Sequence, residues 1–404
     1  MARGLLHKLV MSRRKQDWAM GLAAVLAVLL IIQTLHKAYR PVGYDLTSYL
    51  LSAKALVEGS NPYMVDTSFP YIYPLFLAFV LVPLAMVPYW LANIVWFILS
   101  ISGLLLSCIV LIRTAQSEIR THLGRHLAVP GMLIFLVALS PIQNNLLNGQ
   151  VNLLVLMCCT MFFVSFTRNR VTAGALWLAA AIALKVLPAV LLGFLLIRRR
   201  LRFAFLTVAF AILFCLSPGL ISGKNLIVYY ETYVNSFLLP KLAAVGGGQP
   251  NSFNLQSLLG YFTPQLGQAG WVRFLSFLVP LALVLAVDLR VKRSEHAQRH
   301  VWGFCAYLIG ALLLCPMGQT HQLVLAIPAI ALVVIRGTFD DDWMTTSTRI
   351  VMVCFVVSFV VVPKVLNAKP LHFISLTILI ILLFLASREP SGTLVGPSET
   401  DQPG

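Results

Sequence analysis

Asp45 is the acidic residue best placed for chemistry, because it follows shortly after Trp18–Leu35, an apolar run long enough to cross a membrane. A carboxylate at a membrane surface can take a proton from a hydroxyl group and so serve as a general base. The same residue could instead be the N-cap of the helix that follows, which is worth about 1 kcal/mol. The spacing supports both interpretations, and they are compatible.

Two basic residues lie at the ends of other apolar runs. Lys185 stands in "IALKVLP" with apolar residues on both sides, where an ammonium group costs about 2.5–3.5 kcal/mol on insertion scales. This cost favours a functional role with an anionic headgroup as partner, although the side chain could also extend to the interface. His321, in "CPMGQTHQL", could bind phosphate as a cation or move a proton, or be a structural, hydrogen-bonded histidine.

Amide side chains gather in "NNLLNGQVN", which spans residues 144–152 and includes Asn148 and Gln150. Amides can donate hydrogen bonds to sugar hydroxyls or to a phosphate. The alternative is a loop whose turn is made by the Asn148–Gly149 pair.

The helix after Asp45 is expected to be amphipathic. Its apolar positions recur at helical spacing and form one face, made of Leu46, Tyr49, Leu50, Ala53 and Val57. A helix of this kind lies along the membrane interface. Gly59 is expected to end it, and the Asn61–Pro62 pair to make a turn.

The composition identifies a helical membrane protein with many spans. Of 404 residues, 59% are hydrophobic and only 11% are charged, about half the charged fraction of a soluble chain. Runs such as "LAAVLAVLLII" exclude the alternating pattern of a transmembrane barrel. The formal charge of +16 comes from short basic clusters between apolar runs, which is typical of membrane topology signals. We therefore expect membrane lipids, and no nucleic acid, as partners.

About twelve transmembrane helices are predicted within a single domain, residues 18–386. The basic segment 1–17 and a disordered tail, 387–404, are both expected in the cytoplasm. Tyr71–Val87 is broken by prolines and could span or lie in the interface. The predicted spans are Trp18–Leu35, Trp90–Ile112, Ala128–Ser140, Val151–Phe166, Val171–Leu184, Val186–Ile197, Phe203–Leu220, Val272–Val287, Val301–Leu314, Leu323–Ile335, Ile350–Val362 and Leu371–Ala386.

This arrangement brings the polar motifs together on one side of the membrane. If the N-terminus is cytoplasmic and Tyr71–Val87 does not span, the arginine-rich connections face the cytoplasm and the motifs face outward. The outer face also receives a long loop, Ile221–Gly270, with a glycine-rich stretch and a short amphipathic helix at Asn254–Phe262. Such a loop could act as a lid. A chain with its N-terminus outside and the first loop inside is less favoured by charge.

Taken in order, "SAKALVEGSNPY", "YPLFLAFVLVPLAMVP", "NGQVNLLVL" and "ALKVLPAVLL" resemble the family-87 glycosyltransferases, from about Gly43 to Leu325. The resemblance implies a GT-C-type fold with juxtamembrane helices in the first extracytoplasmic loop. It also implies an inverting transfer of a sugar, mannose by default, from a polyprenyl-phosphate donor to a lipid or glycan acceptor. The reaction would take place on the extracytoplasmic side of the cytoplasmic (inner) membrane.

The resemblance also implies roles for particular residues. Asp45 matches the presumed base, and His321 with Lys185 would contact the donor phosphate. The positions that would contact sugar or acceptor are Asn148, Gln150, Asn61 and Tyr63. No metal or other cofactor is expected, because no second acid is paired with Asp45. The sequence departs from the family pattern in having one histidine in "CPMGQTHQL" and only an approximate Asn-Gln-Ser in "NSFNLQS".

Two alternatives stay open at this point. A lipid or polysaccharide transporter would show internal repeats and ionisable residues near the middle of the membrane. A protein like an O-antigen ligase or polymerase would rely on arginine and histidine in the large outer loop, whereas Ile221–Gly270 contains neither.

Overall fold

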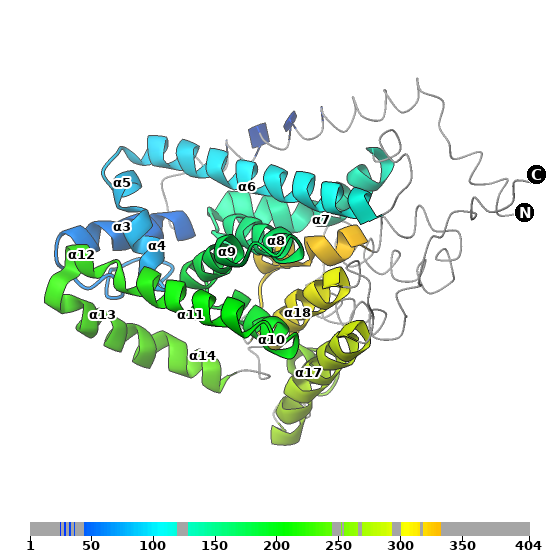
Figure 1. The fold of residues 1–404 in the computed structure, drawn as a ribbon. Coiled ribbons are helices and arrows are strands. Elements are labelled where there is room, and N and C mark those ends of the chain that lie inside the picture. The colour runs from blue at the N-terminus through cyan, green and yellow to red at the C-terminus, as the bar shows by residue number, and fades with distance from the viewer. Residues whose placement is uncertain are drawn as a thin grey trace, which may run out of the picture.

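The computed structural model describes residues 44–118, 128–244, 252, 254–265, 269–292, 300–315 and 318–332, with six isolated positions between 25 and 36. Within these ranges the chain is helical, with turns and irregular connections and no strand (Figure 1). The segments predicted at 1–17, 350–362, 371–386 and 387–404 lie outside the described residues, as does most of 18–35.

Three packed helices form the centre of the fold. They are α8 (Asn152–Thr167), α9 (Val171–Leu184) and α11 (Leu201–Leu216), and α9 packs between the other two (Figure 1). At 1.5 Å per residue they are ~21–24 Å long. The turns into α9 and α11 use Asn169 and Arg199 in left-handed conformations, both with φ of 54°. The predicted spans Val151–Phe166 and Val171–Leu184 correspond closely to α8 and α9.

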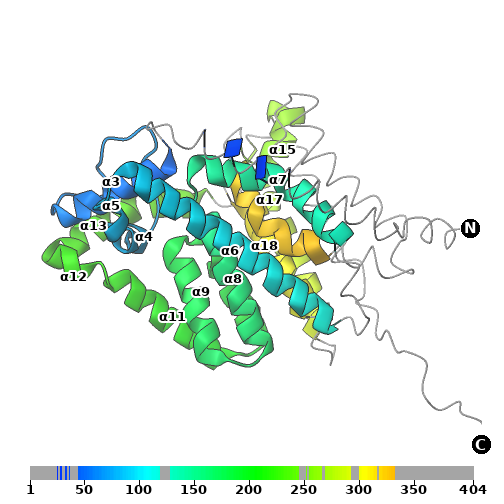
Figure 2. The same ribbon diagram turned by 90° about the horizontal axis from the view of Figure 1, so that it is seen from above.

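Two long helices cover one side of this centre. The first, α6 (Tyr89–Glu118), crosses α8, and α7 (Ala128–Asn148) follows it (Figure 2). The span expected to end at Ser140 instead continues to Asn148, through Pro141. The helix continues because amides that we expected in a loop hydrogen-bond along it, for example from Asn148 Nδ2 to Asn144 Oδ1 at 3.0 Å.

The first polar segment forms three short helices: α3 (Asp45–Val57), α4 (Leu75–Val80) and α5 (Val82–Ala85). At six and four residues, α4 and α5 are ~9 and ~6 Å long, far less than the ~30 Å of a bilayer core. The proline-broken segment 71–87 therefore does not form a single spanning helix.

The face that α3 buries is broader than the sequence pattern predicted. Four of the five predicted positions are buried, but Val57 is 43% exposed and Leu56 lies inside instead, at 1%. The difference arises because α4 and α5 both pack against α3, so that protein covers more than one of its faces. Gly59 follows the helix with φ of 74°, as its predicted role as helix terminator requires.

The chain turns back after α11. The predicted span Phe203–Leu220 ends at Leu216, because Pro218 follows and no N–H is available there to continue the ladder. A helical run beginning at Gly219 then returns beneath α11 (Figure 1). It consists of α12 (Gly219–Ser222), η3 (Gly223–Asn225), α13 (Leu226–Tyr233), η4 (Val234–Leu238) and α14 (Leu239–Ala243). Much of the predicted outer loop is therefore helical.

The short amphipathic helix predicted at Asn254–Phe262 is confirmed as α15 (Leu255–Phe262). Its N-cap is Asn254, whose Oδ1 accepts a hydrogen bond from the backbone N–H of Ser257 at 2.8 Å. This is the usual contact of an asparagine N-cap with an otherwise unpaired donor of the first helical turn.

The remaining helices complete the core. They are η2 (Leu187–Val190), α10 (Leu191–Ile197), α17 (Gly270–Lys292), α18 (His300–Leu314) and η6 (Thr320–Ala326). α17 packs on α18, and η6 packs on α7 and α8. Aromatic rings join the central helices, and Phe163 of α8 stacks on Phe304 of α18 with ring centroids 4.5 Å apart.

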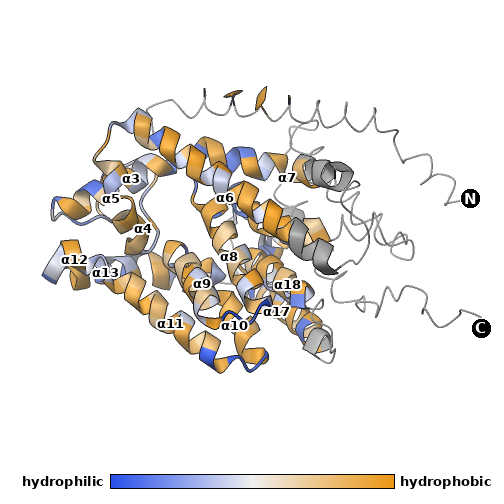
Figure 3. Ribbon diagram, turned by 45° about the horizontal axis from the view of Figure 1, so that its top comes forward, coloured by the Kyte–Doolittle hydropathy of each residue, from blue (hydrophilic) through white to orange (hydrophobic). Residues whose placement is uncertain are grey.

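By length and hydropathy, three described segments can cross a membrane: Tyr89–Leu111, Leu201–Ala243 and Gly270–Leu289. The second of these includes the turn at Gly223, where φ is 52°. Apolar residues dominate these helices (Figure 3), and large side chains such as Phe205, at 72%, are exposed. Helices with such surfaces are suited to contact with lipid. The total of twelve spans stays a prediction.

Candidate functional site

Asp45 is the first residue of α3, and its side chain has a partner in the connection between α7 and α8. The N-cap of α3 is Tyr44, and no side chain caps the helix, so the interpretation of Asp45 as a helix cap was wrong. The Asp45 carboxylate is hydrogen-bonded by the side chain of Gln150. Burial raises the pKa of Asp45 above its ordinary value, while the Gln150 hydrogen bond and the charge of Lys185 act in the opposite direction.

Gln150 is held in one orientation by two tyrosines. Its Oε1 accepts hydrogen bonds from Tyr73 Oη at 3.0 Å and from Tyr49 Oη at 3.4 Å. Since the oxygen of the amide is occupied in this way, its NH₂ group is the part that donates to Asp45. The side chain is 2% exposed. Gln150 therefore orients the carboxylate, and the two tyrosines orient Gln150.

Lys185 lies directly after α9, where the chain becomes extended, with φ of −157° and ψ of 129°. Its Nζ donates to Asn152 Oδ1 at 2.7 Å and lies 5.6 Å from the centre of the Tyr73 ring. It also lies within electrostatic range of Asp45. The sequence placed these two residues 140 positions apart, and the fold brings them to one site.

His321 is joined to the same site through its backbone. Its carbonyl accepts hydrogen bonds from Asn145 Nδ2 and from Asn152 Nδ2, the latter at 3.4 Å. Asn152 Nδ2 also lies 3.2 Å from Asn145 Oδ1. The His321 side chain is 6% exposed and within electrostatic range of Lys185. His321 and Lys185 are therefore neighbours in the fold, and their contact with a phosphate stays a prediction.

Gly149 allows α3 to approach the end of α7. Its φ of 64° is left-handed, and a Cβ at this position would lie 2.6 Å from Leu46 Cβ. Its carbonyl accepts from Trp96 Nε1 at 2.8 Å, which fixes the turn before Gln150. The Asn148–Gly149 turn predicted from the sequence is thus present, one residue after α7 ends.

Three other predicted site residues bind neighbouring protein groups. Asn61 accepts from the Tyr63 backbone N–H and donates to Thr232 Oγ1, both at 3.0 Å. Tyr63 Oη donates to the Tyr73 carbonyl at 3.0 Å. Asn148 is bonded to Asn144 and has no described contact with Asp45. All three hold the segments around the site, and their contact with a sugar stays a prediction.

Sequence reasoning missed the residues that support the predicted ones. Tyr73 connects Gln150 to Lys185, and Asn145 and Asn152 connect Lys185 to His321. The signal available for Tyr73 was the polar face of "YIYP", in which two tyrosines precede a proline. In the part of the chain that the structure describes, no group of three or more His, Cys, Asp or Glu residues converges as a metal site would require.

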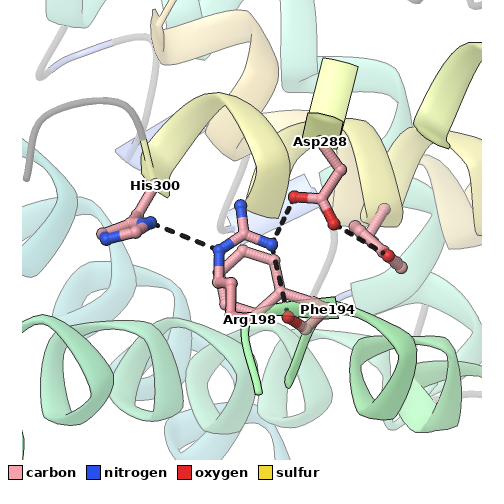
Figure 4. Close-up of polar contacts among 5 residues, drawn as sticks. Phe194, Arg198, Asp288 and His300 are labelled. Atoms are coloured by element: carbon pink, nitrogen blue, oxygen red, sulfur yellow. Dashed lines mark hydrogen bonds and ion pairs between the residues drawn. The ribbon is translucent and has the colours of Figure 1, made fainter. Parts of the chain in front are cut away.

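A second polar cluster, drawn in Figure 4, lies near the turn between α10 and α11, at the opposite end of the central helices. Arg198 and Asp288 form an ion pair whose side chains are 5% and 0% exposed. Arg198 Nε donates to His300 Nδ1 at 3.2 Å, and Tyr307 Oη donates to Asp288 Oδ2 at 3.1 Å. The guanidinium also stacks on Phe194, 3.7 Å from the ring centre. This cluster joins α10, α17 and α18.

Apolar helices with exposed apolar side chains, and with polar clusters buried between them, define an integral membrane protein of the helical class. Residues 71–328 match glycosyltransferase family 87, and the chain belongs to this family. Tyr73, Gln150, Lys185 and His321 lie inside the matched range, whereas Asp45 precedes it and joins the others through the fold. The chain is therefore a membrane glycosyltransferase.

Two other comparisons accompany this match. Among solved structures, the apo state of ArnT from Cupriavidus metallidurans is similar to this chain at 14% sequence identity with a TM-score of 0.43. That match covers 90% of this chain and 77% of ArnT. No curated protein matches the chain.

Proposed function

We propose that the chain moves a sugar from a polyprenyl-phosphate donor to a hydroxyl group of a lipid or glycan acceptor, with Asp45 as the base. The observation that carries this proposal is the half-buried Asp45 carboxylate, which Gln150 hydrogen-bonds and Lys185 faces across the site. The reaction needs a base for the acceptor and a cation for the phosphate, and this site offers one of each. A lipid-linked donor reaches it through the bilayer, so no soluble nucleotide-binding domain is required.

In the proposed step, the acceptor oxygen attacks the anomeric carbon while its proton passes to the Asp45 carboxylate. The bond between that carbon and the phosphate oxygen breaks, and its electron pair stays on the phosphate. Attack from the side opposite the phosphate inverts the configuration. General-base assistance of this kind contributes about 10²–10⁴-fold to the rate.

Lys185 and His321 are proposed to hold the phosphate. Lys185 is positioned by Asn152 and can form a charge-assisted hydrogen bond to the leaving oxygen. His321 is buried more deeply than Lys185, and burial disfavours the charged form of an imidazole, so we propose that His321 acts as a neutral hydrogen-bond donor. Gln150, expected to bind the sugar, is now proposed to act through Asp45 instead, because its oxygen is already occupied.

The distribution of arginines supports an extracytoplasmic site in the cytoplasmic (inner) membrane. The basic turns around Arg168–Arg170 and Arg198–Arg202 lie at the end of the bundle away from Asp45, because α8 and α9 run between them. Arginine-rich connections mark the cytoplasmic side. A cysteine introduced at Thr47 should therefore react with an impermeant reagent added from outside. Reaction only after permeabilisation would place Asp45 on the other side.

The finer assignments come from the family resemblance. We propose mannose as the sugar, no requirement for a metal, and a GT-C-type fold with α3 to α5 as juxtamembrane helices. Asn148, Asn61 and Tyr63 are proposed to shape the wall of the sugar or acceptor site rather than to contact the reacting atoms.

The test is transfer by the purified protein from radiolabelled polyprenyl-phosphate mannose to a membrane lipid extract, with the glucose-linked donor in parallel. We expect a labelled product of inverted anomeric configuration, formed equally well in EDTA. Retention of configuration would overturn the single displacement. Loss of transfer in EDTA would overturn metal independence, and failure with all donors and acceptors would overturn the proposed reaction.

A further inference from the structure

Lys241 is a second basic residue at this site, and the reaction proposed above gives it no role. It belongs to α14, in the helical run that returns beneath α11 (Figure 1). Its Nζ donates to the Ile72 carbonyl at 3.4 Å. The next residue, Tyr73, is the one whose ring faces Lys185. Two ammonium groups from distant parts of the chain therefore lie next to the Ile72–Tyr73 segment.

Acidic residues of the described chain do not balance the charges of both lysines. Lys185 and Lys241 lie within electrostatic range of each other, and like charges repel most strongly where water is partly excluded. Asp45 can balance one of them. The ion pairs formed within the described residues, Lys54–Glu58 and Arg198–Asp288, include neither lysine. Both side chains are partly exposed, so a ligand can reach them.

We infer that Lys241 and Lys185 together bind the phosphate of the lipid, and that Lys241 neutralises the negative charge that this phosphate gains when the sugar leaves. The inference rests on the proposed function, and it adds a residue and an electrostatic role to the site. It predicts that the product released at this site is a lipid phosphate monoester.

The charges of the reaction balance only when both lysines are counted. Before transfer, the phosphodiester and the Asp45 carboxylate each carry one negative charge, which the two ammonium groups neutralise. Transfer moves the acceptor proton to Asp45, and the released monoester carries about −1.5 to −2. The two ammonium groups again neutralise it. With Lys185 alone, the site would hold about one uncompensated negative charge before and after transfer.

The test measures binding, so that it does not depend on the transfer reaction. Farnesyl phosphate, a short lipid monoester, and its methyl phosphodiester are titrated into the purified full-length chain in detergent by calorimetry. We expect wild type to bind the monoester more tightly, and Lys241→Met to weaken monoester binding by at least about tenfold while affecting the diester less. Lys241→Arg should retain the preference, and Lys224→Met, an exposed lysine of the same helical run, should bind like wild type.

The outcomes separate this inference from the proposed function. If Lys185→Met abolishes binding of both lipids while Lys241→Met binds like wild type, the donor site stands and the role of Lys241 is overturned. If wild type binds neither lipid, both are overturned. If inorganic phosphate binds as tightly as farnesyl phosphate and Lys241→Met weakens both equally, the site recognises free phosphate and the lipid assignment is wrong.

Discussion

Gly149 lies against Leu46 so closely that a methyl group at position 149 would come within 2.6 Å of Leu46 Cβ. Because Leu46 follows Asp45 and Gly149 precedes Gln150, this single approach sets the distance between the base and its hydrogen-bond donor. The separation of α3 from the end of α7 is therefore fixed by the absence of a side chain at Gly149.

Gly149→Ala should impair both stability and transfer. The left-handed backbone costs about 1–3 kcal/mol for a residue with a Cβ, and the contact with Leu46 displaces Asp45 from Gln150. The matched control is Gly59→Ala, which has a similar φ of 74° but open space around its Cβ. Thermal unfolding and kcat should show that both variants lose stability and that only Gly149→Ala loses transfer rate. Equal losses of rate would mean that backbone strain alone is responsible.

The pH dependence of transfer should reflect the environment of Asp45. Burial raises the pKa of this carboxyl, and the base must be ionised to act, so kcat/KM should fall on the acid side at a pH above the ordinary value of 3.8. The measurement is kcat/KM against pH in a detergent that keeps the protein folded over the range. An acid limb below that value would contradict the assignment.

Gln150→Met should move this acid limb to still higher pH. The Gln150 hydrogen bond favours the charged form of Asp45, so its removal raises the pKa further. The variant should also lose about 1–3 kcal/mol of stability, because the hydroxyls of Tyr49 and Tyr73 lose their acceptor. Gln143→Met, on α7 but away from these contacts, serves as the control. An unshifted acid limb in Gln150→Met would show that another group titrates.

Asp45→Asn should leave the protein at least as stable as wild type at neutral pH. A carboxyl whose pKa is raised by folding stabilises the fold when protonated and loses that contribution as the pH rises through its folded pKa. Removing the charge should therefore preserve or raise the melting temperature near pH 7, and the difference should shrink as the pH falls. A clear fall in melting temperature near pH 7 would mean that the ionised Asp45 is structural.

The ion pair between Arg198 and Asp288 should matter for folding and little for substrate affinity. Arg198→Met leaves the Asp288 carboxylate buried without its cation, which typically costs about 3–5 kcal/mol. The double variant Arg198→Met/Asp288→Leu removes both charges and should recover much of that loss. Arg202→Met, an exposed arginine nearby, should unfold at the wild-type temperature. A raised KM in the folded Arg198→Met protein would instead connect this cluster to the site.

The sequence was most informative where a residue type is costly in its surroundings. Asp45, Lys185 and His321 stood out because an ionisable group is costly next to long apolar runs, and the fold brings the three together. The turn at Gly149 and the cap at Asn254 were predictable for a related reason, since a left-handed turn and a helix start each favour few residue types.

What could not be predicted depends on contacts between distant segments. Lys241 carries no local signal, and that of Tyr73 is limited to two tyrosines before a proline, because their importance comes from which helices pack together. The extension of α7 to Asn148 was missed for the opposite reason. Its asparagines are common in loops, but here their amides bond within the helix or to the carbonyl of His321.

The most direct test of the account compares sugar transfer by wild type, Asp45→Asn and Glu231→Gln, an exposed acid of α13. Each purified protein is given the same radiolabelled polyprenyl-phosphate donor and acceptor extract, with folding confirmed by its melting temperature. Asp45→Asn should lower kcat by about 10²–10⁴-fold, and Glu231→Gln should behave like wild type. Transfer by folded Asp45→Asn at the wild-type rate would contradict the assignment of Asp45 as the base.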